Sequence, residues 1–270
     1  MQIGASSSCF YPMHTERAAQ LLQDAGFPVI ELFLNAVCEL EPSYTAALRR
    51  QLAQTGTRVI SFHPFSSSME PYYFATDYDR RSADGMELYR RLFDCAAGYG
   101  ARFFNFHGDL KATPYPFERY CENFLALSRV AAEYGLILCQ ENVARCKCGS
   151  IDRILQMRRL LGEEVHFTLD LKQALRSGAN LFEMARAMGP ALCHLHLSDH
   201  APGRDCLAPG CGEFDFVRLF AQLAAGGYGG DAVIELYRDN FGDLAELCGA
   251  AGYLRRCERQ AAADMSNPVG

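Results

Sequence analysis

Residues 136–141 read L-I-L-C-Q-E, a short apolar run that ends in a carboxylate. Similar runs, each with a carboxylate or a histidine at or next to its end, return at 165–170 (V-H-F-T-L-D), 192–197 (L-C-H-L-H-L) and 232–236 (A-V-I-E-L). A longer stretch of helical periodicity follows each run, and the alternation repeats about eight times without a low-complexity linker. This alternation predicts a parallel sheet whose strands are joined by crossover helices.

The expected strands together fill one closed barrel. They are residues 3–7, 29–34, 58–63, 102–107, 136–141, 165–170, 192–197 and 232–236. A chain of 270 residues has the ordinary size of a single α/β barrel. The sequence therefore predicts an α/β fold, one (β/α)8 TIM barrel over residues 1–257, with residues 258–270 as a frayed, small and polar tail.

A doubly wound open sheet would use the same alternation of strands and helices. Such sheets usually carry a glycine-rich nucleotide loop after the first strand. Here the first strand leads into Phe10, Tyr11 and Pro12, without a G-x-G-x-x-G motif or a P-loop. The closed barrel is therefore favoured over the open sheet.

Composition limits the classes of partner. The formal net charge of −6, without a stripe of Lys and Arg, opposes binding to the phosphates of nucleic acid. No apolar run approaches the length of a bilayer span and no signal segment is recognised, so we expect a cytoplasmic protein without a membrane partner. The homo-oligomeric state stays open.

Twelve cysteines are scattered along the chain, and several lie in apolar runs where a thiol packs as a small hydrophobic group. We expect a reducing compartment. Cys146 with Cys148, and Cys206 with Cys211, are the pairs that could bind a soft metal, but neither has the C-x2-C spacing of a zinc knob.

Six of the expected strands end in a residue that can ligate a metal or move a proton. These residues are His63, His107, Glu141, Asp170, His196 and Glu235. In a barrel, the carboxyl ends of all strands meet on one face, which is the face that carries catalysis. Residues spread over most of the chain thus become neighbours.

Glu141, Asp170, His196 and Glu235 form the expected metal site. Three carboxylates that converge on a narrow mouth repel one another unless a cation neutralises them. Three oxygen donors and one imidazole suit a borderline to hard divalent ion: Mn2+ first, with Mg2+, Co2+ or Zn2+ as alternatives. The competing interpretation is four unrelated strand ends, each paired with a neighbouring Arg or Lys.

His63 and His107 have a less defined role. Each can hydrogen-bond a substrate hydroxyl, extend the site to a second metal, or pack under a loop. We favour contact with the substrate.

With these strand ends in order, the chain resembles the xylose-isomerase-like barrels grouped as sugar phosphate isomerases and epimerases. The resemblance runs from Ile3 to about Leu254. Its most specific stretches are T-L-D-L-K-Q-A-L-R-S-G (168–178), H-L-H-L-S-D (194–199), P-G-C-G-E-F-D-F (209–216), and G-Y-G-G with V-I-E-L-Y (227–237).

The resemblance implies that Glu141, Asp170, His196 and Glu235 are the shared metal ligands. In the ketohexose 3-epimerases of this superfamily, the two glutamates also exchange a proton with the substrate carbon from opposite faces. That chemistry is sound, because a metal that polarises a carbonyl makes the neighbouring hydrogen removable. Glu141 and Glu235 would then act as base and acid.

The same superfamily contains the family-two apurinic endonucleases, which need a trinuclear zinc site with additional histidines. Where that pattern has a histidine three residues after the strand-six aspartate, this chain has Gln173. Where it has an Asp-x-His, this chain has Arg204, Asp205 and Cys206. These departures and the acidic net charge disfavour DNA repair.

Gln173 and Arg204 are further expected substrate contacts, and Lys172 and Arg238 are weaker candidates for the same role. Arg holds a hydroxyl, carboxylate or phosphate well through paired donors. Each cation can instead neutralise the carboxylate cluster or lie in solvent.

The expected function is a metal-dependent isomerase or epimerase of a small keto-sugar or a polyol-derived carbonyl compound. A lyase, as in the inosose dehydratase branch, is the first alternative because both reactions begin with the same enolisation. A sugar-binding barrel without turnover is the second alternative. The complete set of four ligands argues against it.

Overall fold

A closed parallel barrel of eight strands forms the centre of the molecule in the computed structural model, which describes residues 1–266. The strands follow the order β1-β2-β3-β4-β5-β6-β7-β10 and close by pairing β10 with β1. Their bounds are β1 Ile3–Ser6, β2 Val29–Phe33, β3 Arg58–His63, β4 Phe103–Phe106, β5 Ile137–Glu141, β6 His166–Asp170, β7 Leu192–Leu197 and β10 Ala232–Ile234. The barrel expected from the sequence is confirmed, and its strand ends shift by no more than two residues.

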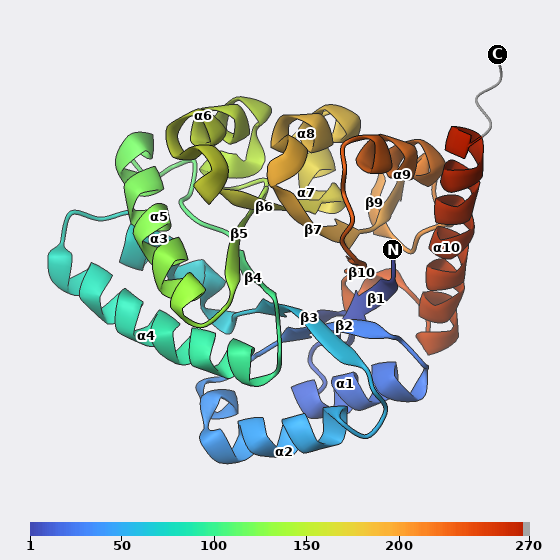
Figure 1. The fold of residues 1–270 in the computed structure, drawn as a ribbon, viewed down its shortest axis with the longest axis horizontal. Helices are drawn as coiled ribbons and strands as arrows, with labels where there is room; N and C mark the ends of the chain where they lie inside the picture. Colours follow the sequence, from blue (N-terminus) through green and yellow to red (C-terminus); the bar gives the residue numbers. More distant parts are fainter. Residues whose placement is uncertain (267–270) are drawn as a thin grey trace.

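Helices surround the barrel on all sides in the view of Figure 1. Their bounds are α1 Thr15–Asp24, α2 Pro42–Leu52, α3 Glu70–Phe74, α4 Asp79–Gly98, α5 Phe117–Glu133, α6 Ile151–Leu161, α7 Leu171–Arg176, α8 Leu181–Met188, α9 Phe216–Ala225 and α10 Leu244–Ser266. Each of the longer helices buries one face. In α9, for example, Phe216, Leu219, Phe220 and Leu223 are buried at helical spacing.

Two segments differ from the sequence-based expectation. Residues expected as a loop after β7 contain a short antiparallel hairpin, β8 (Asp199–Ala201) with β9 (Arg204–Leu207). The expected frayed tail is wrong for residues 258–266, because α10 continues to Ser266 and buries Ala261. The stretch Q-A-A-A-D-M is small and polar, but alanine is the strongest helix former. Residues 267–270 lie outside the described part of the chain.

The interior of the barrel contains a layer of buried polar side chains beneath the strand ends. Its members are Glu31, Ser61, Asn105, Thr168 and His194. Buried polar groups persist where they bond to one another. This layer therefore supports the side chains at the strand ends above it.

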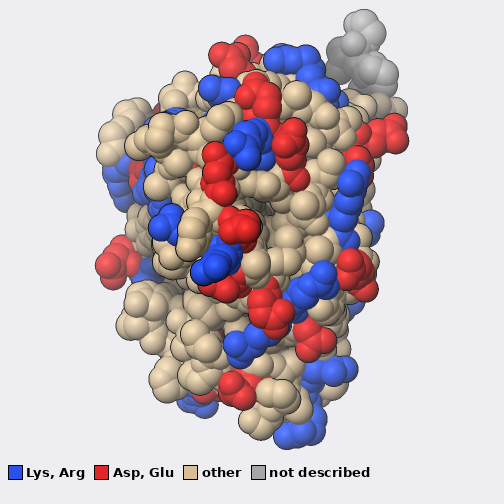
Figure 2. Space-filling view, turned by 90° about the vertical axis from the view of Figure 1, so that its left-hand side faces the viewer, with Lys and Arg blue, Asp and Glu red and all other residues tan. Residues whose placement is uncertain are grey.

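The surface carries charges of both signs. On the face drawn in Figure 2, Lys and Arg alternate with Asp and Glu, and no continuous basic stripe crosses it. Among residues 1–266, no helix combines the length and the apolar character needed to cross a bilayer.

Candidate metal centre

Glu141, Asp170, His196 and Glu235 meet at the carboxyl end of the barrel. One ligand atom from each lies within 4.8 Å of the others. The Nδ1 atom of His196 is 3.4 Å from Oε2 of Glu235, 3.9 Å from Oε1 of Glu141 and 4.0 Å from Oδ2 of Asp170. The structure thus brings together the four residues that the sequence singled out.

The local structure fixes the direction of these side chains. Glu141 ends β5, and Glu235 follows β10, where its backbone N–H donates to the carbonyl of Leu197. Asp170 caps the N-terminus of α7 by accepting from the backbone N–H of Gln173 at 3.0 Å. One Asp170 oxygen is therefore occupied by the helix cap, and the other faces the cluster.

Several buried atoms in the cluster lack a hydrogen-bond partner among the described residues. They are Oε2 of Glu141, Oδ2 of Asp170 and Nδ1 of His196. An unpaired buried polar atom is costly, and most such atoms in folded proteins are satisfied. Three such atoms close together indicate a site that binds an ion or a ligand.

Charge repulsion in the cluster appears in the carboxylate pKa values. Burial raises the pKa of Asp170 to about 7, and the charges of Glu235 and Glu141 add to the rise against the opposing effect of Lys172. Burial also opposes ionisation of Glu141 and Glu235. The imidazole of His107 beside Glu141 and the ammonium group of Lys172 beside Glu235 nevertheless hold both carboxyl pKa values below the ordinary value. Without an added cation, one of the three carboxyl groups is therefore driven toward its protonated form.

Lys172 neutralises part of the negative charge of this cluster. Its Nζ atom donates to Oε2 of Glu235 at 2.9 Å and lies 3.3 Å from Oδ2 of Asp170. The side chain is almost wholly buried, and its pKa is raised because Asp170 and Glu235 outweigh the effect of burial. One lysine supplies one positive charge to a group of three carboxylates.

His63 and His107 lie beside Glu141 and form a second group of possible ligands with it. The Nε2 atoms of the two histidines are 2.9 Å apart, and that of His107 is 3.4 Å from Oε2 of Glu141. Nδ1 of His63 lies 3.2 Å from the carbonyl of Pro64, which orients the ring. Both rings line the same cavity as the glutamates.

That cavity has a volume of about 350 Å³ and opens at the carboxyl end of the barrel. Polar groups line it together with aromatic side chains such as Phe33 and Tyr237. Gln173 also lines it, with its side-chain carbonyl accepting from the backbone N–H of Ala144. A space of this size suits a small molecule.

Arg204 does not line this cavity. It lies exposed at the start of β9 and borders a separate surface hollow with Arg176. Arg238 is also exposed, and its guanidinium donates to the carbonyls of Phe241 and Gly242. Contact between Arg204 and a substrate therefore stays a prediction without geometric support.

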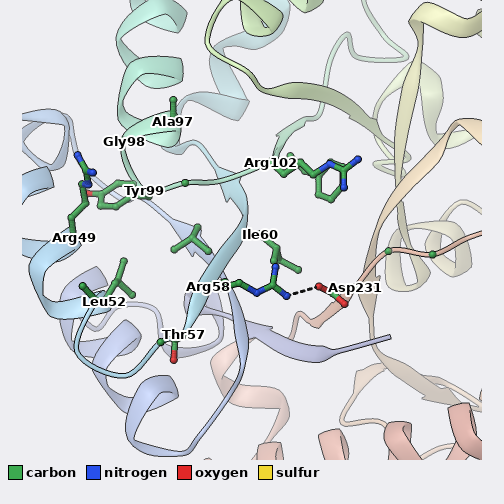
Figure 3. Close-up of a pocket in the computed structure, with 17 residues that line it drawn as sticks. Arg49, Leu52, Thr57, Arg58, Ile60, Ala97, Gly98, Tyr99, Arg102 and Asp231 are labelled. Atoms are coloured by element: carbon green, nitrogen blue, oxygen red, sulfur yellow. Dashed lines mark hydrogen bonds and ion pairs between the residues drawn. The ribbon is translucent and has the colours of Figure 1, made fainter.

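A larger hollow of about 580 Å³ lies at the opposite, amino end of the strands. Figure 3 shows that its arginines do not converge on one point, and that Arg58 pairs with Asp231 at 3.1 Å. Active sites of this architecture lie at the carboxyl end. The smaller cavity beside Glu141, Asp170, His196 and Glu235 is therefore the candidate site.

Sequence reasoning missed Glu31 at this site. Its carboxylate is fully buried below His196 and lies 2.9 Å from Nε2 of that ring. The available signal was a single glutamate inside the apolar run V-I-E-L-F (29–33). An acidic residue within such a strand needs partners in the interior.

The paired cysteines noted in the sequence form no metal-binding group among residues 1–266. Cys146 and Cys148 are buried thiols, Cys206 is buried as well, and Cys211 is exposed.

The model of the family described as "Xylose isomerase-like TIM barrel" matches residues 19–257. An uncharacterized protein of Mycobacterium bovis is 39% identical over 77 residues, which is 28% of this chain and 28% of that protein. The chain thus aligns with little more than a quarter of the curated relatives that it matches.

Solved structures share the fold over nearly the whole chain. A D-tagatose 3-epimerase-like protein has a TM-score of 0.81 at 16% identity, covering 98% of this chain and 100% of that one. The IolI protein, solved with a bound zinc atom, has a TM-score of 0.75 at 13% identity, covering 98% and 99%.

Proposed function

Because the chain belongs to the xylose isomerase-like TIM-barrel family, we propose that it is a divalent-metal-dependent isomerase or epimerase of a small keto-sugar or polyol-derived carbonyl compound. The observation that carries this proposal is the convergence of three buried side chains, Glu141, Asp170 and His196, with the partly buried Glu235 beside a cavity that both glutamates line. A protein of the same fold is named D-tagatose 3-epimerase-like, and the IolI protein of the same fold binds a zinc atom, which supports the proposal.

The residues present fit a divalent ion. Three carboxylates and one imidazole nitrogen face one another, and three of their atoms accept no hydrogen bond in the described chain. This set suits Mn2+ best, with Mg2+, Co2+ or Zn2+ as alternatives. When bound, the ion would polarise a substrate carbonyl and stabilise the negative charge that develops during enolisation.

Glu141 and Glu235 are suited to proton transfer. Glu141 ends β5 and Glu235 follows β10. Because β6 and β7 lie between these two strands in the barrel, the two glutamates approach the cavity from different directions. Both carboxyl pKa values lie below the ordinary value, so both groups are ionised. One glutamate removes the hydrogen next to the carbonyl, and the other returns a proton to the carbon.

His63, His107 and Gln173 line the remaining polar wall and would contact the substrate hydroxyls. The ring of Tyr237, which stands over Nζ of Lys172 at 4.7 Å, offers an apolar face for the carbon skeleton of a sugar. Together these groups would orient a polyhydroxylated compound over the two glutamates.

The test begins with metal analysis of the purified protein, followed by incubation with a panel of keto-sugars, Mn2+ and D2O. We expect solvent deuterium to enter at the carbon next to the carbonyl. Replacing Glu235 by Gln should lower this exchange by at least 100-fold, because a neutral amide cannot accept the proton. Glu87→Gln, on the exposed face of α4, is the matched control and should exchange as the natural chain does.

Two results would overturn parts of this proposal. Full exchange in the Glu235→Gln variant would remove that residue from proton transfer. A product lighter by one water, detected by mass spectrometry, would favour the lyase alternative, which shares the enolisation step.

A further inference from the structure

Glu31 lies directly beneath the candidate metal centre, and its exposed fraction is 0%. A single oxygen, Oε2, accepts hydrogen bonds from Oγ of Ser61 at 2.8 Å and from Nδ2 of Asn105 at 2.6 Å. Nε2 of His196 lies 2.9 Å from the same oxygen. The carboxylate is thus held by side chains of three other strands.

The direction of these hydrogen bonds can be followed around the network. Oγ of Thr168 donates to Oδ1 of Asn105 at 2.6 Å, so the amide nitrogen of Asn105 is turned toward Glu31 and donates to it. Ser61 also donates there. Oε2 of Glu31 is therefore the acceptor of both hydrogen bonds, from Ser61 and from Asn105.

Nε2 of His196 lies 2.9 Å from this oxygen and 3.3 Å from Nδ2 of Asn105, so the shorter contact with the carboxylate favours Nε2 as a third donor. If Nε2 carried no hydrogen, its lone pair would face a carboxylate oxygen at 2.9 Å, which is repulsive. With the hydrogen on Nε2, the lone pair of Nδ1 points to Glu141, Asp170 and Glu235. Nδ1 has no other partner among the described residues.

We propose that Glu31 is a positioning residue that fixes the tautomer and orientation of His196, so that Nδ1 is presented as a metal ligand. This inference rests on the proposed function, since it requires that the centre binds a divalent ion. Partners of this kind orient ligating histidines and increase their basicity, and their loss typically costs 10- to 100-fold in metal affinity.

The test measures Mn2+ affinity by calorimetry in three proteins: the natural chain, Glu31→Gln and Glu70→Gln. Glu70 is the matched control because it is equally buried, but it bonds to Tyr89 and the backbone of Gly108 rather than to any of the four ligands. We expect affinity about 10- to 100-fold weaker in Glu31→Gln and unchanged in Glu70→Gln. Thermal unfolding of the metal-free proteins shows whether both variants remain folded.

A second measurement needs no variant. Nitrogen-15 spectra of the natural protein loaded with Zn2+ should show His196 with a protonated Nε2 and a metal-bound Nδ1. Coordination through Nε2 would overturn the inference, as would equal Mn2+ affinity in a folded Glu31→Gln variant. If the natural chain binds none of the four candidate metals, the proposed function fails as well, so the two failures are distinguishable.

Discussion

Glu70 shows how a single buried carboxyl group can link stability to pH. It lies at the start of α3, is fully buried, and accepts from the backbone N–H of Gly108 at 2.6 Å and from the hydroxyl of Tyr89 at 2.9 Å. Burial raises its pKa to about 8, and the two hydrogen bonds offset only part of that rise. The folded chain therefore holds a proton there that the unfolded chain releases near pH 4.5.

Because the folded chain holds this proton more tightly, the free energy of unfolding falls as the pH rises. The contribution of Glu70 to stability is complete below about pH 4.5 and is lost as the pH rises toward 8. Over that window the loss amounts to about 1.4 kcal/mol per pH unit. The Glu70→Gln variant lacks this titration. Between pH 5 and pH 8 the free energy of unfolding of the variant, measured in urea, should therefore rise relative to that of the natural chain. A constant difference between the two proteins across that range would refute the assignment.

At the scale of one element, Asp199 organises the segment that leads into α9. Its two carboxylate oxygens accept from four backbone N–H groups, those of His200, Gly210, Gly212 and Phe214, at 2.8 to 3.1 Å. Gly212 packs so closely that an added Cβ would lie 2.3 Å from the carbonyl oxygen of His200. These contacts give a structural reason for the P-G-C-G-E-F run that the sequence singled out.

Replacing Asp199 by Asn should destabilise the protein by about 2 to 4 kcal/mol, because the amide nitrogen would face backbone donors and leave them unpaired. Urea unfolding measures this cost. Asp239→Asn, at an exposed position after β10, serves as the control and should change little. Equal stability of the two variants would show that the Asp199 hydrogen bonds do not hold the segment.

At the scale of the whole molecule, the barrel and the convergence of four polar side chains at its carboxyl end were predictable from the sequence. Apolar runs of strand length recur at regular intervals, and a parallel barrel gathers their carboxyl ends at one face. Glu141, Asp170 and His196 needed no further information than this rule, and Glu235 lies just beyond its strand.

The support beneath and beside these ligands was less accessible from sequence. Glu31 interrupts an apolar run, and only the register of β2 against β3, together with the closure of the barrel, shows which donors surround it. The pairing of Lys172 with Glu235 joins residues 63 positions apart and depends on how α7 leaves β6. The hairpin β8–β9 was missed because its strands have only three and four residues.

We expect a divalent ion to bind among Glu141, Asp170, His196 and Glu235. Crystals grown with Mn2+ and measured near the manganese absorption edge would reveal that ion. One strong anomalous peak should lie within bonding distance of an oxygen from each carboxylate and of Nδ1 of His196. Side chains turned away from one another, with no peak between them at saturating Mn2+, would contradict this expectation.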